Sequence, residues 1–156
     1  MKNPITIALC VCMSLYSLCS TAQNVIPINE PDVNKPRLFQ SLPENFPVRM
    51  LDITALFGSE LGRPVSLSLS DAVAFQFDGN IVSMANKYDN RIKSVVVRST
   101  NFPGASFTIS KITDERGTIS YTGRILSMQH GDLFELSTVN DQLVFVKRKF
   151  YDLVNE

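Results

Sequence analysis

Few groups in this chain could perform acid–base, nucleophilic or metal chemistry. Its single histidine is His130, and its three cysteines all fall within the first 22 residues. A Ser-His-Asp triad would have to use His130, which stands beside Gly131 and Asp132 in a predicted hairpin turn. We interpret His130 as an exposed turn residue and Asp132 as a turn former that bonds nearby backbone amides.

The chain also has few residues that could hold a metal ion or a cofactor. A zinc site needs three or four histidine, cysteine or carboxylate ligands, and beyond residue 22 the chain has one histidine and no thiol. The pairs Asp89-Asn90 and Asp114-Glu115 lie in predicted turns and lack the spacing of a calcium loop. No glycine-rich loop opens a helix to hold a phosphate. A glycosidase-type carboxylate pair stays open as an alternative, but the composition predicts no metal, no cofactor and no enzymatic activity.

Four residues are candidates for binding instead of catalysis. Phe102 stands at a predicted hairpin tip before Pro103-Gly104, where polar residues are typical. An aromatic residue there can anchor a partner, or it can fold back and cap the end of a barrel. Arg98 and Arg124 lie on predicted strands, and an arginine pointing inward would need a buried acid or a ligand. His130 completes this speculative set.

The elements that would position these residues are strands. Val65, Leu67 and Leu69 alternate with serines, which predicts a half-buried strand. Val73, Phe75 and Phe77 repeat the pattern, and the breaks between later runs carry Gly, Pro, Asn and Asp. Short connections favour antiparallel pairing of neighbours. The sequence therefore predicts an all-β fold, a curved meander of about seven strands that forms a small barrel or, less favoured, a sandwich. The later runs are 91–100, 105–113, 117–129, 132–138 and 142–150.

An internal duplication is also predicted. Residues 77–84 align without gaps on residues 121–128, sharing an aromatic residue, a glycine, an isoleucine, an aliphatic residue and Ser-Met. A glycine in the middle of a strand permits a bulge or a sharp bend. We expect the inward phase to change after Gly79 in the first copy and after Gly123 in the second, as in a sheet that curls over.

The chain divides into three parts. A basic start, an apolar stretch over 5–18 and the small residues Ser20-Thr21-Ala22 predict a signal peptide over 1–22. A lipid anchor at Cys19 and a retained membrane anchor are the alternatives. Five prolines mark 23–47 as an extended leader, a tether or a cover for a sheet edge, with one helical turn near 37–41. The β domain is 48–156, with a short helix within 48–62 and an apolar C-terminal tail, 150–156, that docks on the domain.

Charge and compartment narrow the function. The 15 basic and 15 acidic residues balance, so no nucleic-acid or anionic-membrane partner is indicated. The run Lys147-Arg148-Lys149 is interpreted as a solvated strand end, with a binding patch as the alternative. A thiol-free exported chain fits a bacterial periplasmic or extracellular setting. The leading hypothesis is a non-enzymatic exported domain that binds an unknown protein or surface component through loops or a sheet edge. The alternatives are a lipocalin-like carrier of a small apolar ligand and a protease-inhibitor or propeptide-like module.

Overall fold

The computed structural model describes residues 35–154, so the predicted signal peptide and the first part of the leader lie outside the described residues. Within them, eight strands and two short helices follow one another along the chain. None of these helices has the length and apolar character to cross a membrane. The elements are β1 (Asn45–Pro47), α2 (Met50–Leu56), β2 (Pro64–Ser68), β3 (Gln76–Lys87), β4 (Ile92–Ser99), β5 (Ala105–Thr113), β6 (Ile119–Ser127), β7 (Asp132–Val139), β8 (Gln142–Lys149) and α3 (Phe150–Val154).

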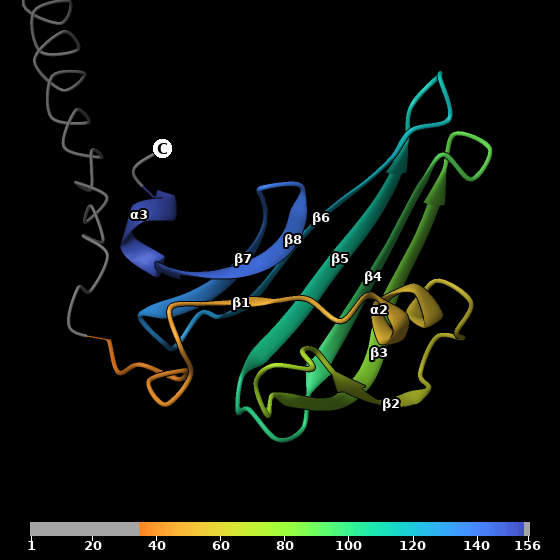
Figure 1. The fold of residues 1–156 in the computed structure, drawn as a ribbon. Helices are drawn as coiled ribbons and strands as arrows, with labels where there is room; N and C mark the ends of the chain where they lie inside the picture. Colours follow the sequence, from red (N-terminus) through yellow and green to blue (C-terminus); the bar gives the residue numbers. More distant parts are fainter. Residues whose placement is uncertain (1–34, 155–156) are drawn as a thin grey trace, which may run out of the picture. The chain divides into compact units, whose positions relative to one another are not determined.

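All eight strands belong to one curled antiparallel sheet with the order β1-β8-β7-β6-β5-β4-β3-β2 (Figure 1). The strands β2 to β8 form a meander, because each pairs with its neighbour in sequence. This confirms the predicted all-β fold, and the curled sheet is the barrel-like alternative. The count differs by one, because residues 45–47 of the predicted leader pair with β8 as an edge strand, a position that tolerates proline.

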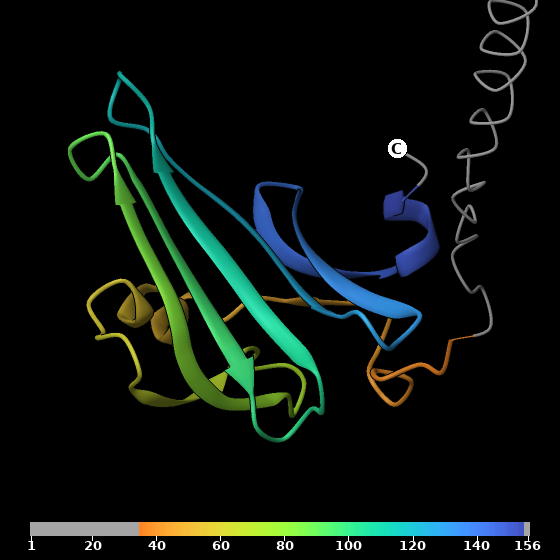
Figure 2. The same ribbon diagram turned by 180° about the vertical axis from the view of Figure 1, so that it is seen from behind.

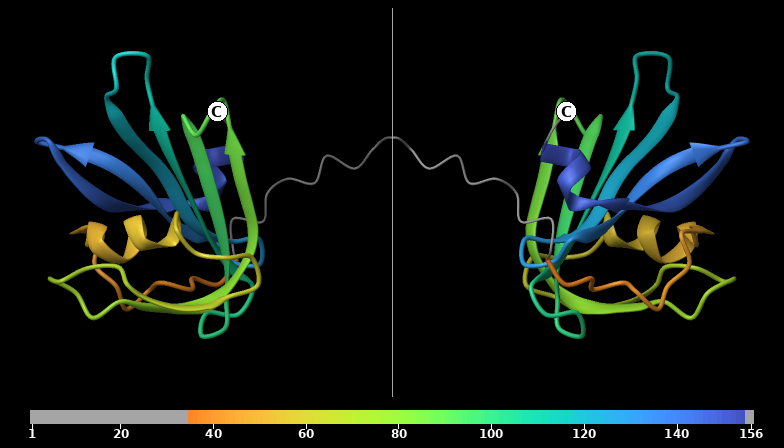
Figure 3. Two further views of the ribbon diagram at one scale, coloured as in Figure 1. Left: turned by 90° about the vertical axis from the view of Figure 1, so that its right-hand side faces the viewer. Right: turned by 90° about the vertical axis from the view of Figure 1, so that its left-hand side faces the viewer.

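Residues just after β1 bring the two ends of the sheet close together. The Val48 amide donates to the Leu143 carbonyl on β8 (3.0 Å), and the next amide, of Arg49, donates to the Leu69 carbonyl beyond β2 (2.9 Å). The helix α2 follows at once and lies on the open side of the curl (Figure 3). It was predicted within 48–62, and it buries Ile53 and Leu56 against the inner face of the sheet.

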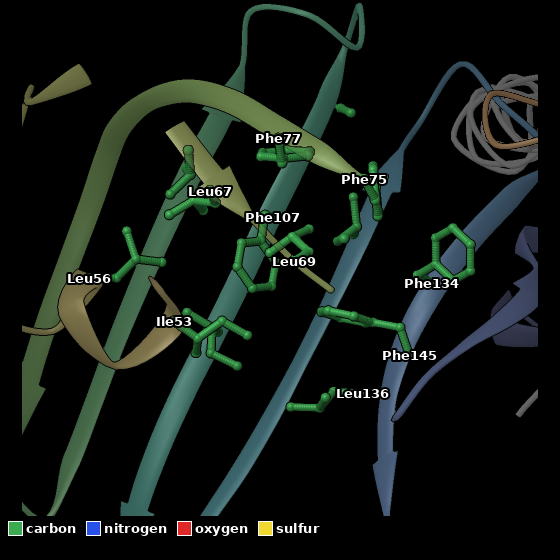
Figure 4. Close-up of a cluster of buried hydrophobic side chains, with 14 of the residues drawn as sticks. Ile53, Leu56, Leu67, Leu69, Phe75, Phe77, Phe107, Phe134, Leu136 and Phe145 are labelled. Carbon is green, nitrogen blue, oxygen red and sulfur yellow. The ribbon is translucent and has the colours of Figure 1, made fainter. Parts of the chain in front are cut away.

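Phenylalanine side chains fill the inside of the curl. Seven of them are fully or almost fully buried, and ring centroids of neighbouring pairs lie 5.0–6.4 Å apart, from Phe46–Phe134 to Phe134–Phe145. Figure 4 shows several of these rings converging with Ile53 and Leu56 from α2. Such contacts fill the interior with protein side chains. The buried members are Phe39, Phe46, Phe75, Phe77, Phe107, Phe134 and Phe145.

The leader residues that the structure describes pack on the sheet. The Asp132 carboxylate, 3% exposed, accepts hydrogen bonds from the Leu38 amide (2.6 Å) and the Phe39 amide (2.9 Å). Asp132 was expected to bond nearby amides, and this was wrong, because its partners lie more than 90 residues away. Residues 38–42 make turns rather than the expected helical turn. The leader thus covers a sheet edge, which was one of the two alternatives for it.

The predicted docking of the C-terminal tail is seen at its first residue, Phe150, whereas Tyr151 and Asp152 are exposed. The Phe150 amide donates to the Gly131 carbonyl (2.9 Å), which continues the pairing of β8 with β7 by one step. The Lys35 ammonium lies 4.9 Å from the centre of the Phe150 ring. From Phe150 the chain turns into α3.

The two strand glycines that marked the predicted duplication both lie against a neighbouring backbone. A Cβ at Gly79 would collide with the Arg98 carbonyl oxygen, and one at Gly123 would lie 2.7 Å from the Thr108 oxygen. In β3 the register shifts between Ile81 and Ser83, so the inward phase changes there as expected. In β6 the register with β5 is continuous, so the expected change after Gly123 was wrong.

Candidate functional site

Phe102 has a packing role in this fold. Its ring is half-buried and lies 5.4–6.0 Å from the rings of Phe39, Phe75 and Phe77. The Ser99 hydroxyl accepts a hydrogen bond from the Phe102 amide (2.9 Å), which holds the loop in this conformation. Phe102 therefore folds back and caps one end of the core, the second of the alternatives that its position allowed.

Arg98 and Arg124 lie on the outer face of the sheet. Arg98 is exposed and alternates with the buried residues Val95 and Val97 of β4. Arg124 stands opposite Glu135 on β7, and their side chains pair at 3.5 Å. The structure does not bring either arginine together with Phe102, whose ring packs inside the curl.

His130 lies in the β6–β7 turn and is half-buried rather than exposed. Its Nδ1 is 2.8 Å from the Ser127 hydroxyl, which also accepts a bond from the Gln129 amide (3.3 Å). Ser127 is 0% exposed, and both oxygens of the nearby Asp132 accept leader amides. A serine nucleophile must be reachable by its substrate, so this arrangement holds a turn together and does not present a catalytic triad.

The basic run at the end of β8 is largely paired. The Lys147 ammonium lies 3.5 Å from Glu44, and the Arg148 side chain lies 3.8 Å from Glu135. Lys149 is exposed at the strand end. Within residues 35–154 no group of three or more histidine, aspartate or glutamate side chains is placed to hold a metal ion.

The most unusual feature of the sheet is a split between β6 and β7. Their pairing covers only Arg124–Leu126 on β6 and Leu133–Glu135 on β7, although each strand continues well beyond it. Residues 119–123 of β6 pair only with β5, and residues 136–139 of β7 pair only with β8. Figure 1 shows the β7–β8 hairpin diverging from β5 and β4, and Figure 2 shows the same wedge from behind.

The hydrogen bonds at the ends of the two strands show which way their backbone groups point. The Asp114 amide donates to the Thr118 carbonyl (3.0 Å), so even-numbered residues of β6 bond to β5 and odd-numbered ones face the other way. Ile119, Tyr121 and Gly123 therefore direct their N–H and C=O groups into the split. On β7, the hydrogen bond from the Phe150 amide to the Gly131 carbonyl shows that the backbone groups of odd-numbered residues point toward β8. The backbone groups of the even-numbered residues 136 and 138 therefore point toward the split.

The two outer edges of the sheet are better protected. On β2 the outward-facing positions are Pro64, Ser66 and Ser68, because the odd-numbered neighbours bond to β3. Proline has no N–H, and the Ser68 amide donates to the Asp52 carboxylate of α2 (2.9 Å). On β1 the outward positions are Asn45 and Pro47. Each outer edge thus offers one N–H donor, which blunts strand addition there.

A row of polar side chains crosses the inner face of the sheet beside the split. Lys93 on β4 stands directly opposite Lys111 on β5, and Lys111 stands directly opposite Tyr121 on β6. By alternation these residues share the inner face with the buried Val95 and Ile109. Both lysines are half-buried, and neither ammonium group has a hydrogen bond or ion pair within residues 35–154.

This lysine pair is energetically unfavourable for the free protein. Like charges directly opposite each other on neighbouring strands destabilise a sheet. Phe57, at the end of α2, packs over the row, with its ring centroid 6.3 Å from that of Tyr121. A shallow pocket beside Phe57 is lined by Met84, Asn86 and Lys93 among others. Sequence reasoning missed the row: strand parity with Val95 and Ile109 places each lysine on the inner face, but the register that makes them neighbours comes from the structure.

Comparison with models of protein families gave no match for this chain. No curated protein and no solved structure matched it either. The function proposed below therefore rests on the geometry of the domain alone.

Proposed function

We propose that this chain is an exported, non-enzymatic domain that binds an extended segment of a partner protein along the free edge of β6. One observation carries the proposal. The pairing of β6 with β7 stops after three residue pairs, so the β6 edge over residues 119–123 has no strand partner on that side.

Strand addition is a recognised way to bind an extended peptide, because main-chain hydrogen bonds supply affinity and alternate side chains supply specificity. Beyond the last residue pair, the β6 edge offers the N–H and C=O groups of Ile119 and Tyr121. Backbone groups without partners are a liability in a sheet. The outer edges are blunted by Pro47, Pro64 and the Asp52 contact, whereas nothing comparable protects the split among the residues that the structure describes.

The alternative of a small-ligand carrier is less well supported. A carrier needs an internal cavity, and small barrels either fill their interior with side chains or hold one ligand. Here seven buried phenylalanines occupy the inside of the curl. The protease-inhibitor alternative would be a special case of protein binding, with a protease as the partner. The proposed setting, a bacterial periplasm or the extracellular space, rests on the predicted signal peptide over 1–22.

The proposal can be tested with a phage-displayed library of random twelve-residue peptides, selected against the protein produced from the full sequence. We expect enriched peptides that slow amide hydrogen exchange of Ile119, Tyr121 and Gly123 when bound. Ile119→Pro removes one edge donor at the first residue of β6, where proline is tolerated. It should weaken binding several-fold, by the loss of one hydrogen bond, while the matched control Ile119→Val should bind normally.

Two results would contradict the proposal. One is a library that yields no enriched binders. The other is a set of binders that protect some other surface and leave the exchange of the β6 edge unchanged.

A further inference from the structure

The split in the sheet opens beside the only two directly opposed lysines of its described strands. We infer that the bound segment carries an acidic side chain, which enters on the inner face next to Tyr121 and is recognised by Lys111. This inference rests on the proposed function, because it names the chemistry of a segment bound along β6.

The register of the sheet places the acidic group. A strand added to the free edge of β6 would put one residue directly opposite Tyr121, at the usual strand spacing of about 4.8 Å. Its side chain would continue the inner row that runs through Tyr121, Lys111 and Lys93. Lys111 is then two strands away, about 10 Å by the same spacing, a span that a lysine and a glutamate side chain cover by extending toward each other.

Charge complementarity supports an acidic group over a neutral one. Residues 35–154 provide neither lysine with a carboxylate or a hydrogen-bond acceptor. The ion pairs of the domain involve other residues, for example Arg124–Glu135 on the outer face and Arg91–Glu115 near the hairpin tips. A carboxylate that meets the Lys111 ammonium group would offset part of the repulsion between the two lysines and form charge-assisted hydrogen bonds with Lys111. The Tyr121 hydroxyl, which has no hydrogen-bond partner within residues 35–154, is a further donor.

A second copy of this chain fits the site less well. Self-association through the same edge would bring another 119–123 segment, Ile-Ser-Tyr-Thr-Gly, against β6. That segment has no acid, and it would bring the lysine rows of both copies closer together. Charge therefore favours a partner of different sequence over a homodimer at this edge.

The test uses individual peptides from the selection described above, with their affinities measured by isothermal titration calorimetry. We expect an acidic residue at one fixed position among the enriched peptides. Lys111→Gln should weaken their binding by about tenfold or more, the scale of a lost hydrogen bond to a charged group. Lys87→Gln is the matched control, because Lys87 lies at the end of the neighbouring β3, is exposed, and faces outward by alternation with Met84 and Asn86. It should leave the affinity unchanged.

Replacing the acidic residue of the peptide by its amide completes a double-mutant cycle. The amide peptide should bind the unchanged protein about as weakly as the acidic peptide binds Lys111→Gln, and the two changes together should add little. Circular dichroism of each variant checks that it is folded, and Lys93→Gln, one strand further from the bound segment, should weaken binding less than Lys111→Gln.

The outcomes separate the two proposals. Peptides that protect the β6 edge but show no acidic preference, or that bind Lys111→Gln and Lys93→Gln with unchanged affinity, overturn the recognition of an acid and leave strand addition standing. Peptides that fail to protect the edge overturn the proposed function, and this inference with it.

Discussion

Asp132 should hold the leader on the domain, and its replacement by asparagine tests this directly. The Asp132 carboxylate accepts the Leu38 and Phe39 amides through different oxygens and is 3% exposed. Asp132→Asn keeps the shape of the side chain but turns one oxygen into an NH₂ group, which faces an N–H donor. One charge-assisted bond is lost and one buried amide is left unpaired, so we expect a loss of about 3 kcal/mol in the free energy of unfolding.

Equilibrium unfolding in urea, followed by circular dichroism, measures this change as a shift of the midpoint. Asp141→Asn is the matched control. Asp141 is exposed in the β7–β8 turn with a φ of 61°, a left-handed conformation that asparagine also adopts readily. Its midpoint should not move.

A double-mutant cycle shows whether Asp132 acts through the leader. Phe39 is 0% exposed, and its own amide is one of the two that donate to Asp132. Phe39→Ala alone should therefore cost about 3–5 kcal/mol. If the carboxylate positions Phe39, the combined variant should lose clearly less than the two single losses together. A loss below about 1 kcal/mol for Asp132→Asn, set against the range for an unpaired buried amide, would refute the reasoning. Additive losses in the cycle would refute it as well.

Three further predictions concern the sheet and its core. Gly79→Ala should cost about 1–3 kcal/mol of stability, the range for overpacking, because its Cβ would collide with the Arg98 carbonyl. The control Gly58→Ala, whose Cβ would have its nearest atom at 3.8 Å, should leave the melting temperature unchanged. Equal melting temperatures for the two variants would contradict this. Phe102→Ala should cost about 2 kcal/mol in urea unfolding, less than a fully buried ring, because its ring is half-buried; an unchanged midpoint would mean that the ring does not cap the core. In the free protein, amide exchange measured by NMR should alternate along 119–123, fast at odd-numbered residues and slow at even-numbered ones; uniform protection would mean that another strand covers the edge.

The strands themselves were largely predictable from local signals. Alternation such as that of Val65, Leu67 and Leu69 reports one buried face wherever the strand lies, and short turns force neighbours to pair antiparallel. The meander and the helix after β1 follow from such local patterns. The strand β1 did not, because three residues that include a proline have no period of their own and become a strand only by pairing with β8.

The candidate site was much less accessible to the sequence. Phe102 stood out because an aromatic residue at a turn is unusual, and the fold uses it for packing. Lys93 and Lys111 did not stand out, because a lysine on a strand is ordinary until its partner across the sheet is known. Strand parity alone places each on the inner face, but only the register of β4 with β5 makes them neighbours.

The sequence by itself determined which segments become strands, where the chain turns and how richly the inside is supplied with phenylalanine, because these depend on residues close together in the chain. Tertiary structure decided the rest. It brought Asp132 to amides more than 90 residues away, and it set Lys111 between Lys93 and Tyr121. It also ended the β6–β7 pairing after three residue pairs. Curl and twist accumulate over the whole sheet, so the point at which two strands part has no local mark in either of them.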